Sequence, residues 1–116
     1  MIAGSAGASA RVEITRGNPV TYNDPGLTER MLPTLKRIAG ATTVIAAPPQ
    51  TVSEDFSLYQ ERVPGLFFFL GITPPGVDSA LAAPNHSPRF YADEGTIVTG
   101  VRALAGLAVD YLLQEK

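Results

Sequence analysis

The sequence predicts an α/β fold, in which strands and helices alternate along 116 residues. Residues 42–46 are a short run rich in β-branched residues, which predicts a buried strand, and residues 66–70 are apolar on both faces, which is typical of a strand covered on both sides. Residues 96–114 carry apolar side chains at helical spacing, which predicts a long amphipathic helix. We expect both strands to lie in one sheet, with this helix packed on a face of it. Its apolar stripe consists of Ile97, Val101, Leu104, Ala108 and Tyr111.

Earlier in the chain, the sequence predicts one more strand and a first long helix. Alternating polar and apolar residues at 11–15 indicate a half-buried strand. The helix should span residues 25–39, because Asp24 suits the N-cap and Pro25 suits the first helical position. Pro33 removes a backbone hydrogen bond within that helix, so we expect either a kink or two short helical pieces.

A second, shorter helix is expected over residues 53–62, after a turn rich in proline. Ser53 can cap it, and Glu54 and Asp55 then fall in the first turn, where the helix dipole favours acidic side chains. Two adjacent carboxylates could also perform acid–base chemistry, but their place at a helix start already explains them. The acidic pair at residues 93–94, ahead of the last helix, has the same explanation.

Composition narrows the classes of function. Nine basic residues against eleven acidic ones leave a net charge of -2, so nothing favours a nucleic-acid backbone as partner. No uninterrupted run of 18 apolar residues occurs, and the first residues lack the pattern of a secretory signal. We therefore expect a cytoplasmic protein with no membrane partner. Charged residues make up only 17% of the chain, against about 25% in typical proteins, which predicts either that the chain associates with something or that it is a piece of something larger.

His86 is the one histidine, and the chain has no cysteine. Ser87 is its direct neighbour, and adjacent residues rarely meet in the geometry of a catalytic triad. A zinc site normally takes three or four protein ligands. His86 together with Glu54, Asp55 and the acidic pair at 93–94 could supply a mixed site, although their spacing does not require one. These residues alone indicate an α/β domain without an assigned function.

Four motifs, taken together and in this order, resemble the C-terminal stretch of the M20 metallopeptidase family. They are residues 53–56 (SEDF), 63–71 (VPGLFFFLG), 85–90 (NHSPRF) and the acidic pair 93–94 before the last helix. The branch that they resemble most contains hippurate hydrolases, N-acyl-amino-acid amidohydrolases and auxin-conjugate hydrolases. Residues 8–14 (ASARVEI) are similar to the point where the family's inserted lid domain ends.

This resemblance implies a C-terminal fragment of such an enzyme. Residues 1–22 would be the remnant of the end of the inserted lid (dimerisation) domain, and residues 23–116 the C-terminal part of the catalytic domain. The implied fold is a partial three-layer arrangement of a sheet with helices, as in two-metal aminopeptidase-like domains. In the family, the other metal ligands and the general-base glutamate lie in an N-terminal half that the matching motifs do not include, so no catalytic residue is assigned here.

The implied chemistry is metal-dependent hydrolysis of N-acyl amino acids or related amides, with zinc, manganese or cobalt as the metal. His86 matches a histidine that binds metal in the family, and Glu54 and Asp55 match a motif near the site. The implied partners are the missing N-terminal half or a second copy of the chain. We expect the isolated chain to be inactive and to bind no metal tightly. The alternatives are a non-catalytic fragment kept as a structural or interaction module, and an unrelated small α/β binding domain.

Overall fold

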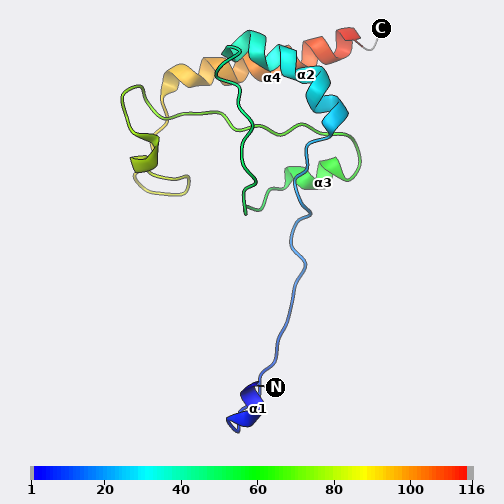
Figure 1. Ribbon diagram of the computed structural model, residues 1–116, viewed down its shortest axis with the longest axis vertical. Coiled ribbons are helices and arrows are strands. Elements are labelled where there is room, and N and C mark those ends of the chain that lie inside the picture. The colour runs from blue at the N-terminus through cyan, green and yellow to red at the C-terminus, as the bar shows by residue number, and fades with distance from the viewer. Residues whose placement is uncertain (1, 115–116) are drawn as a thin grey trace.

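The computed structural model describes residues 2–114, which form helices joined by long extended segments (Figure 1). Met1 and residues 115–116, which the two predicted domains include, lie outside the described residues, and the domain boundaries stay a prediction. The elements in order are α1 (Ile2–Ser5), α2 (Pro25–Ala39), α3 (Phe56–Gln60), the 3₁₀ helix η1 (Ser79–Leu81) and α4 (Glu94–Gln114).

The predicted α/β fold, with its partial three-layer sheet, is wrong for the part of the chain that the structure describes, which contains no strand. Residues 11–15 and 66–70 are extended, whereas residues 42–46 begin in a turn and continue as irregular chain. A strand requires a neighbour that exchanges backbone hydrogen bonds with it, and neither extended segment finds one. Phe69 is 60% exposed, so its expected burial between layers is wrong, while Phe67 and Phe68 are half-buried.

The first predicted helix is confirmed. α2 begins with proline at its first turn, and the Asp24 carboxylate accepts a hydrogen bond from the Leu27 amide at 2.7 Å, which is the expected N-cap. The helix continues through Pro33, so the alternative of two separate pieces is wrong, and Figure 1 shows it bending along its length. It ends at Gly40, whose φ of 97° suits glycine and few other residues.

The second predicted helix is shorter than expected. α3 comprises Phe56–Gln60 and not residues 53–62, because Ser53 does not cap it and the chain remains irregular as far as Glu54. The Glu54 carboxylate instead accepts a hydrogen bond from the Phe56 amide at 3.2 Å. The two acidic residues therefore precede the helix and do not occupy its first turn.

α2 and α4 pack against each other, and this pair holds most of the buried apolar side chains. Met31 and Leu35 of α2 and Ala103 of α4 are the buried apolar residues of the described chain. A Cβ added at Gly106 would lie 2.5 Å from Cδ1 of Ile38, so the glycine permits close approach of the two helices.

Polar contacts fix the same pair near the end of α4. The Thr34 hydroxyl and the Arg37 guanidinium both donate to Oδ2 of Asp110, at 2.5 and 2.7 Å. The Thr34 hydrogen bond and then the Arg37 contact hold the pKa of Asp110 below its ordinary value. The Arg30 guanidinium lies over the Tyr111 ring, 4.1 Å from its centroid, and donates to the Tyr111 carbonyl oxygen.

The chain as a whole is open. Its radius of gyration is 19.9 Å, whereas a compact domain of this length would have about 13 Å. Its accessible surface is 9797 Å², against about 6,100 Å² for a folded monomer of 12.2 kDa. Residues 2–22 contribute to both differences, because they extend away from the helices as a long arm (Figure 1).

By length and composition alone, α4 could cross a membrane, and within residues 2–114 it is the one helix for which this holds. Only 6% of its most apolar stretch is buried. Core helices of proteins in water can have the same length and composition, so the expectation of no membrane partner stays a prediction.

Candidate functional site

The chain just before α2 is joined to the extended segment that follows α3. The side-chain amide of Asn23 donates to the Phe67 carbonyl oxygen and accepts from the Phe67 amide, both at 2.7 Å. The Asp24 amide donates to the Gly65 carbonyl oxygen at 3.0 Å. Asn23 thus satisfies the two backbone groups that a neighbouring strand would otherwise bind, across a separation of 44 residues.

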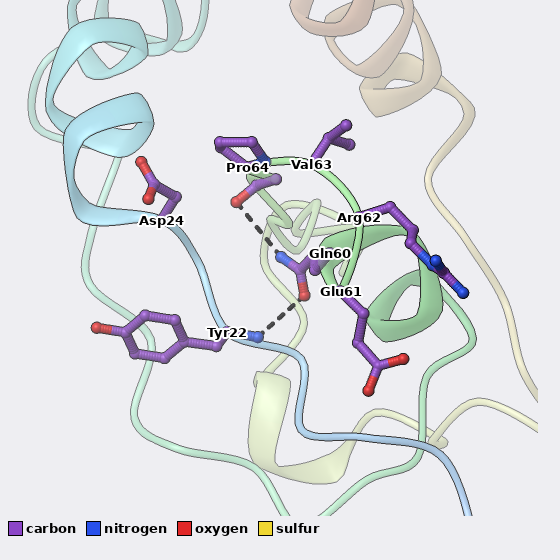
Figure 2. A pocket seen from close by; sticks show the side chains of 8 residues that line it. Tyr22, Asp24, Gln60, Glu61, Arg62, Val63 and Pro64 are labelled. Carbon is purple, nitrogen blue, oxygen red and sulfur yellow. Dashed lines mark hydrogen bonds between the residues drawn. The ribbon is translucent and has the colours of Figure 1, made fainter.

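Gln60, the last residue of α3, completes this junction (Figure 2). Its side-chain oxygen accepts from the Tyr22 amide at 3.0 Å, and its side-chain nitrogen donates to the Gly65 carbonyl oxygen at 3.3 Å. An open cleft of about 290 Å³ lies beside it. The cleft is lined by Tyr22, Asp24, Gln60, Glu61, Arg62, Val63, Pro64 and Gly65. Asp24 and Gln60 already serve as a helix cap and a backbone bridge, so these two polar side chains of the cleft have structural tasks.

His86 lies in a tight turn within the loop that joins residue 72 to α4. The Ser87 amide donates to the Pro84 carbonyl oxygen at 3.2 Å, which closes the turn. His86 itself has a φ of 68°, the left-handed conformation, and among residues 2–114 no other residue except glycine has a positive φ. Histidine adopts this conformation more readily than most residues. The side chain is exposed, so the imidazole is accessible to a ligand supplied from outside the loop.

Glu54 and Asp55 directly precede α3, which lies apart from that loop. In Figure 1 the loop that follows the extended segment is on the left, and the short α3 that follows the two carboxylates is on the right. Asp55 accepts a hydrogen bond from the side-chain amide of Asn18 at 2.5 Å. Their carboxylates contact the arm and the start of α3, and the structure does not bring them to His86.

The described residues do not form a complete metal site. No group of three or more histidine, cysteine, aspartate or glutamate side chains within residues 2–114 is placed to hold a metal ion. His86 alone supplies one imidazole ligand, whereas zinc sites take three or four protein ligands. The residues present therefore do not fit a bound metal by themselves, and the assignment of His86 as a ligand stays a prediction.

Asn23 and Gln60 are the structurally important side chains that sequence reasoning missed. Asn23 directly precedes the N-cap Asp24 and Gln60 falls within the second predicted helix, and the sequence alone assigns neither side chain a role. Asn23 binds Phe67, 44 residues away, and Gln60 binds the Tyr22 amide, 38 residues away. Gln60 also binds the Gly65 carbonyl oxygen across a turn. No local spacing rule indicates such a partner, so one sequence offers no signal for either residue.

Comparison with protein families identifies the class. Residues 5–110 match the peptidase family M20/M25/M40, and the chain belongs to this family, whose members are metal-dependent hydrolases. No solved structure matches the chain. The resemblance to the M20 family inferred from its motifs is thereby confirmed at the level of the family.

Relatives in the family carry several different activities in their names. YhaA of Bacillus subtilis, which is named as an amidohydrolase, is 34% identical over 105 residues, or 90% of this chain. Thermostable carboxypeptidase 2 of Saccharolobus solfataricus is 33% identical over 95% of the chain. IAA-amino acid hydrolase ILR1-like 4 of Arabidopsis thaliana is 35% identical over 84%. The matches cover 26%, 27% and 22% of these relatives, so the chain spans about a quarter of their length.

Proposed function

We propose that the chain is the C-terminal portion of a metal-dependent hydrolase that cleaves the amide bond of N-acyl amino acids or related conjugates. The observation that carries this proposal is the match over residues 5–110, with relatives named as an amidohydrolase and as IAA-amino acid hydrolases. In this proposal His86 provides one ligand to zinc, manganese or cobalt, and its exposed imidazole faces a partner surface that supplies the remaining ligands.

The chain by itself is proposed to be inactive, because its described residues do not assemble a ligand set. A divalent metal in such enzymes polarises the scissile carbonyl and activates a water molecule. Within this chain, the tight turn that holds the His86 backbone fixes where its imidazole is presented. The Asn23 junction holds the extended segment from which the His86 loop starts. Within this chain Glu54 and Asp55 are not brought to His86, so their proposed place near the site depends on the rest of the enzyme, and no catalytic task is assigned to them.

The test is complementation. We would co-express the chain with carboxypeptidase 2 of Saccharolobus solfataricus from which the 111-residue matched region has been removed, and assay hydrolysis of hippurate and other N-acyl amino acids with each metal. We expect no turnover from the chain alone and measurable turnover from the pair. His86→Ala should abolish that turnover, while Ser87→Ala, which leaves the imidazole in place, should retain most of it. Turnover that survives His86→Ala would contradict the ligand assignment.

The alternative function, a structural or interaction module without catalysis, draws support from the open shape and large exposed surface of the chain. It predicts that the pair forms but stays inactive with every metal and substrate tested. The same co-expression therefore separates the two functions.

A further inference from the structure

The arm formed by residues 2–22 carries two arginines, Arg11 and Arg16, in a stretch without regular structure. Residues 8–24 form neither helix nor strand, and every side chain from residue 4 to residue 18 is exposed. Among residues 2–114, no backbone-to-backbone hydrogen bond involves residues 9–23. Figure 1 shows this stretch as an extended trace that leads away from the helices. Exposed chain that the rest of a protein does not hold is where proteases preferentially cleave.

Asn18 makes the first hydrogen bond between the arm and the rest of the described chain. Its side chain donates to the Asp55 carboxylate at 2.5 Å, and four residues further on the Tyr22 amide donates to the Gln60 side chain at 3.0 Å. Before Asn18, the hydrogen bonds and the ion pair of the described residues stay within the arm. A break in the chain just before Asn18 therefore leaves the polar contacts of α2, α3 and α4 intact.

The other arginine and lysine residues of the described chain are protected by their backbone. A protease binds its substrate as an extended chain, so a hydrogen-bonded amide at the bond to be cleaved must first be released. Beyond the helices, the amide that follows Arg62 donates to the Tyr59 carbonyl oxygen at 3.1 Å. The amide that follows Arg89 donates to the Ser87 carbonyl oxygen at 3.0 Å. The remaining residues lie within the hydrogen-bonded turns of α2 and α4, and they are Arg30, Lys36, Arg37 and Arg102.

Arg16 suits a protease better than Arg11 does. The Arg11 guanidinium forms an ion pair with the Glu13 carboxylate, which competes with an acidic pocket for the same charge. Arg16 forms no ion pair within residues 2–114. The peptide bond after Arg16 is also open, because a Cβ added at Gly17 would have no neighbouring atom within 4 Å. Of all the arginine and lysine residues that the structure describes, Arg16 thus combines an available charge with an available peptide bond.

We infer that the Arg16–Gly17 bond is a processing site for an endoprotease of trypsin-like specificity, which binds a basic side chain through a carboxylate in its pocket. The reaction consumes one water molecule. The C–N bond breaks, the Arg16 carbonyl carbon takes the hydroxyl group and becomes a carboxylate, and the Gly17 nitrogen takes the hydrogen and becomes an amine. The products are residues 1–16 and 17–116. This inference goes beyond the proposed function and does not depend on it, since it uses only the arm.

The experiment is limited digestion of the full chain with trypsin, followed over time by intact mass. We expect residues 17–116 to be the first large product. Arg16→Gln should slow its release at least about tenfold, because the charge that the pocket binds is lost. Arg102→Gln makes the same change on an exposed side chain of α4, and should change the rate less than about twofold. Glu13→Gln should speed cleavage after Arg11 and leave the rate after Arg16 unchanged.

Two further measurements show whether the folded structure selects the bond. In urea that unfolds the chain, the preference for Arg16 should disappear, because every arginine and lysine is then equally accessible. The purified product 17–116 should keep the urea midpoint of the uncut chain, because its polar contacts begin at Asn18. A first cut after Arg11, Arg62, Arg89 or a helical residue would overturn the inference. So would a preference for Arg16 that persists in the unfolded chain, or a product that has lost its cooperative unfolding.

Discussion

In the α2–α4 pair, the faces that pack find their partners within the same chain, whereas the backbone groups of residues 66–70 are bound, within the described part of the chain, only by the side chain of Asn23. Both regions are strongly apolar, so composition does not separate them. The difference is the kind of partner that each needs. A helix forms its backbone hydrogen bonds within itself and needs a neighbour only for apolar contact. A strand also needs a neighbour that forms hydrogen bonds with its backbone. Helices therefore form in a partial domain in which strands do not.

The largest effect should come from the interior of the helix pair. Met31 is 2% exposed, so Met31→Ala should leave a cavity between α2 and α4 and destabilise their packing by about 2–5 kcal/mol. Urea unfolding followed by circular dichroism measures this loss. Ile45→Ala removes an apolar side chain of similar size that is 80% exposed, and should cost less than about 0.5 kcal/mol. Equal losses in the two variants would show that the helix pair is not the stable part of the chain.

The close approach of the two helices gives the next effect. Gly106→Val should cost about 1–3 kcal/mol, because the new side chain would overlap Ile38 and press on Thr34 of α2. The control is Ala105→Val, which puts the same residue type on the exposed side of α4 and should cost about 0.5 kcal/mol. Unfolding in urea again provides the measurement. A smaller loss at Gly106 than at Ala105 would mean that the helices do not meet there.

The extended segment should respond to Asn23. Asn23→Ala removes both hydrogen bonds to Phe67 and should cost about 1–2 kcal/mol. Hydrogen exchange gives the sharper measurement, since the Phe67 amide should lose its protection in Asn23→Ala. Asn23→Asp keeps an acceptor for that amide and should retain part of the protection. Unchanged exchange at Phe67 in both variants would remove Asn23 as the partner of this segment.

Local signals in the sequence predicted the helices well. Asp24 and the proline after it located the start of α2, and the spacing of apolar residues located α4 to within two residues. The predicted bounds of α3 were wrong because Glu54 binds the Phe56 amide from outside the helix. Each correct interpretation used residues that lie within or directly beside the helix that they define.

Features that depend on partners distant in the sequence were not predicted correctly. Residues 66–70 have the composition of a central strand, but a sheet also needs neighbours that residues 2–114 do not supply. The apolar stripe of α4 was expected to pack inward, yet its members Ile97 and Val101 are exposed and the side with Ala103 contacts α2. His86, Glu54 and Asp55 were considered as one site, whereas the structure holds them on different segments.

The smallest effect, and the most specific to the helix pair, concerns the pKa of Asp110. Its carboxylate accepts hydrogen bonds from Thr34 and Arg37, which lower its pKa in the folded chain below the ordinary value of 3.8. A depressed pKa means that the native state favours the charged form. The stabilisation is therefore complete above the ordinary value and is lost as the pH falls through the lower, folded value.

We expect the midpoint of urea unfolding to fall on acidification below about pH 4, and Asp110→Asn to reduce this dependence because residue 110 then no longer titrates. Asp78→Asn, in the loop outside the helix pair, should leave the dependence unchanged. The carboxylate is partly open to solvent, so salt should weaken the Arg37 part of the effect more than the Thr34 part. Thr34→Val, which keeps the shape and removes the hydroxyl donor, should therefore reduce the pH dependence even in high salt. If Asp110→Asn and Asp78→Asn gave the same pH profile, the contact of Asp110 with α2 would contribute nothing to the stability of the pair.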